Sequence, residues 1–126
     1  MKKLASEMTQ AERDLAEDWF DETRSGVTAD EVIFKGEIED APPGPVKDEL
    51  NVQKGRLLRA RAKLDRAEEA FFTQGTKALN PPSDDDINET KRLTQALADR
   101  IIEEKVSQAV VKLVSDVSNF VSKVLA

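Results

Sequence analysis

The chain has 126 residues, of which 35% are charged and 5% are aromatic, and its formal net charge is −6. This length is enough for one small domain, and so few apolar side chains support only a modest core. There is no Cys and no His, which excludes disulfides, thiolate metal sites and histidine general bases. We therefore expect an all-α helical bundle with no catalytic residue, cofactor or metal ion, and not an enzyme.

Charge is distributed unevenly along the chain. Residues 1–50 contain six Lys or Arg against fourteen Asp or Glu, whereas residues 51–80 contain seven against three. An acidic N-terminal region therefore precedes a basic middle, and electrostatic attraction between the two is the simplest expectation.

The N-terminal residues predict an amphipathic helix. Apolar residues recur there at helical spacing, and the set is Leu4, Met8, Ala11, Leu15, Trp19 and Phe20. This period predicts a helix over residues 2–24 that stops near Ser25 and Gly26. Its opposite face is acidic, and we expect that face either to be solvated or to dock a basic surface.

The sequence leaves two conformations open for residues 28–34. Thr28 and Glu31 have the spacing of a capping box, which favours a short helix, whereas the alternation in residues 31–39 favours a strand. Residues 36–45 have the composition of a linker. We therefore expect an acidic N-terminal region over 1–45, separate from the remainder of the chain.

The strongest period follows the prolines of residues 42–45. Apolar or small residues recur at alternating spacings of four and three, and the set is Val46, Leu50, Gln53, Leu57, Ala60, Leu64, Ala67 and Phe71. This heptad pattern predicts a helix over residues 46–73, which Gly75 and the pair Pro81-Pro82 terminate.

A basic stripe lies on the same predicted helix. Arg56, Arg59, Lys63 and Arg66 are spaced three, four and three residues apart, so they share one face. Such a stripe could bind phosphates, but no aromatic residue is interleaved and the chain is acidic overall. We expect these cations to pair with the acidic N-terminal region or with a neighbouring subunit, and we expect no nucleic acid.

The last helix begins at a clear signal. Ser83 is a favourable N-cap, and three aspartates follow it in the first turn, where the helix dipole stabilises carboxylates. No Gly or Pro occurs after Pro82, so one helix of about 40 residues is allowed. The apolar stripe shifts by one position partway along, which predicts a stutter or bend near Ile101–Val106. A helical hairpin over residues 46–126, turning at residues 75–83, is the simplest arrangement.

The end of this helix is rich in valine and has no obvious cover. Seven residues are predicted to contact a partner or another copy of the chain, namely Val110, Leu113, Val114, Val117, Phe120, Val121 and Val124. Ser107, Ser115, Ser118 and Ser122 lie beside them, and small side chains permit close approach of helices. The expected hairpin partner covers only part of this face, so we expect a homo-oligomer.

The corner and the final helix carry a resemblance to a known family. The residues concerned are Asn80–Asp84 at the corner, then Val111-Lys112, Asp116-Val117 and Val121. This pattern resembles the needle and inner-rod subunits of bacterial type III secretion systems, and the resemblance is confined to residues 46–126. It implies a subunit that polymerises through its C-terminal helix into a hollow tube.

Two functions follow from the sequence. The first is a non-enzymatic, self-assembling structural subunit of this secretion type. The alternative is a discrete acidic helical binding module, chaperone-like, immunity-like or regulatory, that acts on a protein partner. We expect no membrane span and no cleaved signal, hence a cytoplasmic protein, or one exported without a cleaved signal if the resemblance holds.

Overall fold

The computed structural model describes all 126 residues, Met1–Ala126. It contains four α-helices and no β-strand, and the helices are α1 (Gln10–Asp40), α2 (Pro45–Glu68), α3 (Asp84–Glu104) and α4 (Gln108–Leu125). A 3₁₀ turn, η1 (Ala5–Glu7), precedes them, and a π-helical turn, η2 (Glu69–Thr73), extends α2. The predicted all-α fold is confirmed.

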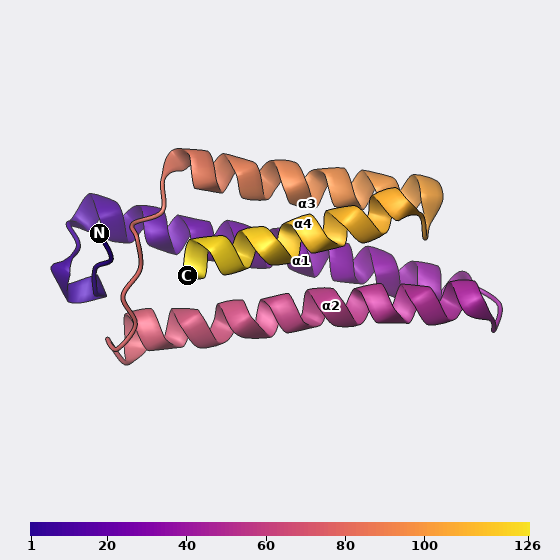
Figure 1. Cartoon of the computed structure of the whole chain (residues 1–126), viewed down its shortest axis with the longest axis horizontal. Helices are drawn as coiled ribbons and strands as arrows, with labels where there is room; N and C mark the ends of the chain where they lie inside the picture. The colour runs from indigo at the N-terminus through magenta and orange to yellow at the C-terminus, as the bar shows by residue number, and fades with distance from the viewer.

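The four helices form an elongated bundle in which α1 and α3 run in one direction and α2 and α4 in the other (Figure 1). α1 packs against α2 and α3, and α4 packs against the same two helices. α2 and α3 therefore lie on a diagonal, and residues 74–83 cross the end of the bundle to join them. The expected antiparallel hairpin is not formed, because α3, which follows α2 in the chain, does not pack against it. The part of the predicted last helix that contacts α2 is α4, which runs parallel to α2.

α1 starts later and ends later than the sequence pattern predicts. A capping box starts it, because the Thr9 side chain accepts a hydrogen bond from the Glu12 N–H while the Glu12 carboxylate accepts one from the Thr9 N–H. The helix then continues through Gly26 and Gly36 to Asp40. The predicted helix over 2–24 is therefore wrong at both ends, residues 28–34 are helical, and the linker is only residues 41–44.

These boundaries make α1 part of the bundle rather than a separate region. Its buried side chains face both α2 and α3, and they are Ala16, Trp19, Phe20, Thr23, Val27, Asp30, Glu31 and Phe34. The predicted stripe is only partly confirmed before Trp19. Leu15 packs against the core and Met8 is buried, but Leu4 and Met8 precede the helix and Ala11 is exposed. Gly26 does not end the helix because it lies where α1 and α3 approach closely.

α2 follows its predicted heptad pattern. Every member of the predicted set from Leu50 to Phe71 is buried, and only Val46, in the first turn, is exposed. The polar member is also accommodated, because the Gln53 side chain donates to Glu49 Oε1 at 2.7 Å and accepts from Arg56 at 2.8 Å. A period of 3.5 residues therefore located the buried face of this helix correctly.

The predicted single last helix is in fact two helices. Ser83 caps α3 as expected, and the predicted stripe of Ile87, Thr90, Thr94, Leu97 and Ile101 is buried. The chain then reverses at Lys105, whose φ is +59°, and α4 starts behind an Ser107 N-cap. A continuous helix would carry α4 about 27 Å beyond the bundle, whereas reversal packs it on α2 and α3. The irregularity falls within the predicted 101–106 region, but it is a reversal rather than a bend.

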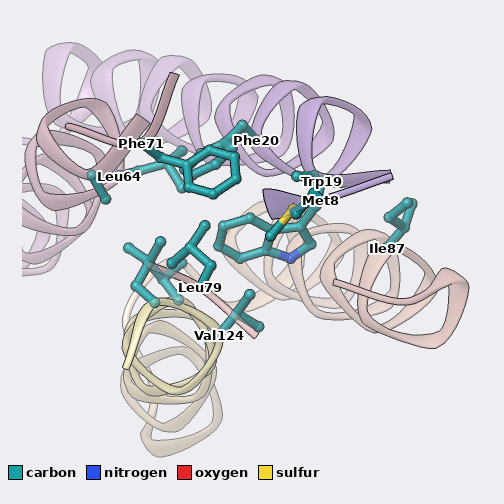
Figure 2. Packing of buried hydrophobic residues seen from close by; sticks show 12 residues of the cluster. Met8, Trp19, Phe20, Leu64, Phe71, Leu79, Ile87 and Val124 are labelled. Atoms are coloured by element: carbon teal, nitrogen blue, oxygen red, sulfur yellow. The ribbon is translucent and has the colours of Figure 1, made fainter. Parts of the chain in front are cut away.

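Trp19, Phe20 and Phe71 fill the end of the bundle at which both termini lie, whereas Phe34 belongs to a second core cluster (Figures 1 and 2). Trp19, Phe20 and Phe71 are fully buried there, and the rings of Trp19 and Phe20 pack edge to face at 5.2 Å. Leu79, from the connection between α2 and α3, joins the same cluster.

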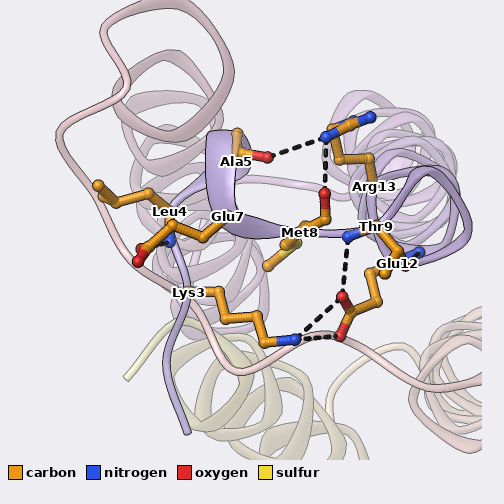
Figure 3. Close-up of polar contacts among 8 residues, drawn as sticks. All are labelled: Lys3, Leu4, Ala5, Glu7, Met8, Thr9, Glu12 and Arg13. Atoms are coloured by element: carbon orange, nitrogen blue, oxygen red, sulfur yellow. Dashed lines mark hydrogen bonds and ion pairs between the residues drawn. The ribbon is translucent and has the colours of Figure 1, made fainter.

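The N-terminal segment closes this end of the bundle (Figure 3). Lys3 and Leu79 exchange backbone hydrogen bonds at 2.7 and 2.9 Å, and Met8 is buried in the aromatic cluster. Arg13 donates to the carbonyl oxygens of Ala5 and Met8, while the Lys3 ammonium lies 3.1 Å from the Glu12 carboxylate. Residues 1–9 are thus held to the bundle by both backbone and side-chain contacts.

Candidate functional site

The predicted contact face of α4 lies mostly inside the bundle. Five of its seven residues are buried, namely Val110, Val114, Val117, Val121 and Val124, and the other two, Leu113 and Phe120, are partly buried against the core. The first three valines pack in a cluster with residues such as Leu57 and Leu97, and the last two join the aromatic end. The rest of this chain therefore covers the valine-rich face.

Self-assembly through the buried valines of α4 would require exposing them, which costs free energy. Burial of one valine side chain stabilises a fold by about 2 kcal/mol, so exposing all five would cost on the order of 10 kcal/mol. That figure is comparable to the whole stability of a small domain, about 5–15 kcal/mol. A contact between copies through these residues would have to replace the contacts that α2 and α3 now make.

The predicted basic stripe faces a groove between α2 and α4. The groove has a volume of about 270 Å³, and it is lined by Arg56, Arg59, Ala60, Lys63, Ser118, Val121 and Ser122. Arg56 donates to the Ser115 hydroxyl, and the Lys63 ammonium donates to the Ser122 hydroxyl at 2.9 Å. Three members of the stripe are thus brought together against the serine face of α4. We call this surface the α2/α4 groove.

The basic surface continues past the groove toward the end of the bundle. A second hollow shares Lys63 and adds two further cations, and its residues are Lys63, Arg66, Ala67, Ala70, Lys77 and Leu125. Arg66, the last member of the predicted stripe, lies here. From Arg56 to Arg66 the cations extend about 15 Å along α2.

None of the four stripe cations forms an ion pair within the chain. The carboxylates between α1 and α2 pair with other cations: Arg24 contacts Asp65 and Glu68, and Arg61 lies 2.9 Å from Glu31. The expected pairing of the stripe with the acidic N-terminal region is therefore not observed. The reason is geometric, because the stripe lies on the α4 side of α2 and α1 packs on another side.

The serines opposite the stripe are the functional candidates that the sequence did not single out. The sequence predicts only that Ser115, Ser118 and Ser122 permit close packing of helices, yet Ser115 and Ser122 accept hydrogen bonds from groove cations. Their spacing of three and four residues matches that of the stripe, which was the available signal. Pairing the two patterns requires knowing that α2 and α4 are neighbours.

Two buried carboxyl groups lie away from the groove. Burial chiefly, with the nearby charges of Asp99 and Glu31, raises the pKa of Asp30 to about 8, and one oxygen of Asp30 has no hydrogen-bond partner. Burial also raises the pKa of Glu31, although Arg61 and Lys54 act in the opposite direction. Neither residue lines the α2/α4 groove.

The run of three aspartates at residues 84–86 starts α3. Asp86, from the run of three aspartates, accepts a hydrogen bond from the Ser83 N–H in the capping box of α3. No three Asp or Glu side chains are grouped so as to hold a metal ion. None of the four helices combines the length and the apolar character that crossing a bilayer requires.

The chain matches no protein-family model, no curated protein and no solved structure.

Proposed function

We propose that this chain is a non-enzymatic helical module that acts, as a discrete bundle, by binding a protein partner. One observation carries the proposal: the valine-rich face of α4 is covered by helices of the same chain. A bundle whose helices bury one another's apolar faces does not need further copies to complete its core. The charged surface is then left for recognition, and the unpaired cations of the α2/α4 groove are its most distinctive part.

Light scattering after size exclusion, over a hundredfold range of concentration, tests this proposal. The full chain should keep the mass of one bundle throughout. A chain stopped at Asp116 lacks Val117, Val121 and Val124, so it should lose its helical circular dichroism because the core is incomplete. Open-ended growth of the full chain would refute the discrete module.

A self-assembling subunit of the type III secretion needle or rod is the second candidate. The reversal at Lys105 favours it, because no Gly or Pro interrupts residues 83–126 and a single residue with φ of +59° ends α3. If Lys105 and the extended Ser107, whose φ is −146° and ψ is 170°, both became helical, α3 would join α4 and the valines would be exposed for contacts with other copies. In the same light-scattering experiment, this candidate requires assemblies that disappear when the chain stops at Asp116.

A further inference from the structure

We propose that the α2/α4 groove, taken together with the hollow at Arg66 that continues it, is the docking site for an acidic α-helix of the protein partner. This inference rests on the proposed function and names the element of the partner that the groove recognises. Three features of the groove support it: the spacing of its cations, the small size of most of its other side chains, and the uncharged serine partners of two cations. No Asp or Glu lines it.

The spacing of the cations matches the repeat of a helix. Arg56, Arg59, Lys63 and Arg66 recur every three or four residues along α2, so one cation follows another roughly every 5 Å. Carboxylates at the same spacing on a partner helix recur at the same interval. A helix that lies along the groove can therefore place one carboxylate beside each cation without distortion of either chain.

Most of the other side chains that line the groove are small. Ala60, Ser118 and Ser122 line it beside Val121, and Ala67 and Ala70 continue the surface beside Leu125. Small side chains let the backbone of a fifth helix approach closely, whereas large apolar ones would fill the space. The groove is therefore shallow, and the cations of α2 line one side of it.

The serine hydroxyls orient cations without neutralising them. The contacts of Arg56 with Ser115 and of Lys63 with Ser122 hold two charged groups beside the groove. A hydroxyl accepts a hydrogen bond but carries no charge, so the positive potential of the groove persists. Charge-assisted hydrogen bonds to a carboxylate are stronger than those to a neutral oxygen, which favours an acidic occupant.

Nucleic acid is a poorer fit than an acidic helix. The groove residues include no aromatic side chain on which bases could stack. On another side of α2, a hollow between α1 and α2 is lined by five carboxylates, namely Glu17, Asp21, Asp65, Glu68 and Glu69. A polyanion much longer than the 15 Å basic surface would encounter this acidic surface. A single acidic helix can end where the cations end.

The test uses a fluorescein-labelled synthetic helix made of three Glu-Ala-Ala-Glu-Ala-Ala-Ala heptads, and its binding is followed by fluorescence anisotropy. A matched peptide with Gln in place of every Glu is the ligand control. The full chain should bind the acidic peptide at low ionic strength, and the complex should dissociate at high salt because exposed charges are screened. The Gln peptide should not bind.

A pair of double variants assigns the binding to the groove. Arg59→Gln with Arg66→Gln removes two exposed stripe cations that make no hydrogen bond within the chain, so the fold should be kept. Arg92→Gln with Arg100→Gln makes the same change of charge on α3, where both side chains are exposed. The groove variant loses two ion pairs with the peptide, so its affinity for the peptide should fall about tenfold. The α3 variant should bind the peptide as the parent does.

Three results would overturn the docking site: no binding of the acidic peptide at low salt, equal weakening in both double variants, or tighter binding to a single-stranded oligonucleotide or to anionic phosphatidylserine vesicles. Failure of the groove is distinguishable from failure of the proposed function. A chain that keeps the mass of one bundle but does not bind the peptide excludes the groove alone, whereas open-ended assembly excludes the discrete module.

Discussion

Gly26 of α1 lies directly against Thr94 of α3. A Cβ atom built on Gly26 would be 2.5 Å from Thr94 Oγ1 and 2.8 Å from its Cβ and Cγ2 atoms, separations that carbon and oxygen atoms do not tolerate. The Thr94 side chain is itself fixed, because its hydroxyl donates to the Thr90 carbonyl oxygen at 2.9 Å. The two parallel helices therefore approach so closely at this point that only glycine fits.

Gly26→Ala should destabilise the protein despite its better helix propensity. Propensity alone would stabilise α1 by about 1 kcal/mol, whereas forcing a methyl group into a packed contact costs about 2–3 kcal/mol. We expect a net loss of about 1–2 kcal/mol in the free energy of unfolding, measured by urea denaturation.

Gly36 provides the matched control. It lies in the same helix, and nothing is within 4 Å of the position where its Cβ would be. Gly36→Ala should therefore stabilise the protein by about 0.5–1 kcal/mol. If the two variants shift stability in the same direction, the close approach of α1 and α3 is not what selects glycine at position 26.

This contact also explains why the sequence alone predicted the wrong end for α1. A glycine inside a helical pattern can mark a stop or a close approach, and only the position of α3 decides between the two. The predictions that succeeded depend on local pattern: the period of Leu50–Phe71 and the cap at Ser83. The reversal at Lys105 contains no Gly or Pro, and its two signals in the sequence are the shift in the apolar stripe and Ser107, which caps α4.

The candidate site was predictable only in part for the same reason. The spacing of Arg56, Arg59, Lys63 and Arg66 identified one face of α2 correctly. What lies opposite that face depends on the order of the helices around the bundle, which places α4 rather than the acidic α1 there. The sequence predicts that the valine-rich face must be buried. It does not predict that the reversal at Lys105 packs this face against α2 and α3 of the same chain.

Asp30 should make the stability of the bundle depend on pH. Its pKa is about 8 in the folded protein and about 3.9 in an unfolded chain. Between these values the folded state holds one more proton than the unfolded state, so stability falls as pH rises from about 4 to about 8. Above that range the loss is complete.

Asp30→Asn removes this titration. The variant should be more stable than the parent by on the order of 5 kcal/mol at pH 8, and the difference should shrink as the pH approaches 4. Urea denaturation at several pH values gives both curves. Asp99→Asn removes a neighbouring charge that raises the Asp30 pKa, so the loss of stability should end at a lower pH. Parallel curves for the parent and Asp30→Asn would contradict the assignment.

Thr90 is the acceptor for the single tryptophan. The indole N–H of Trp19 donates to Thr90 Oγ1 at 3.1 Å, and the Thr23 hydroxyl lies 3.3 Å from the same oxygen. Thr90→Val keeps the shape but leaves the buried indole N–H without an acceptor, which should cost about 1–3 kcal/mol. Thr90→Ser, which keeps the hydroxyl, should cost less. Tryptophan fluorescence during urea unfolding measures both, and a valine variant as stable as the serine variant would show that the hydrogen bond contributes little.

Lys105 allows the reversal between α3 and α4 to be tested directly. Its φ of +59° and ψ of −79° lie near the strained γ-turn conformation, which glycine adopts readily and other residues do not. The Lys105 ammonium also contacts the Glu37 carboxylate at 2.8 Å, so its loss must be controlled. Lys105→Ala removes that ion pair and keeps the strain, whereas Lys105→Gly removes both.

The glycine variant should therefore be more stable than the alanine variant by about 1–2 kcal/mol, as measured by thermal unfolding. This order is opposite to helix propensity, which favours alanine by about 1 kcal/mol wherever the residue is helical. An alanine variant that is the more stable of the two, and that elutes as a larger species, would mean that residues 84–125 form one continuous helix. The valines of α4 would then be free for contact with other copies, as the secretion-subunit alternative requires.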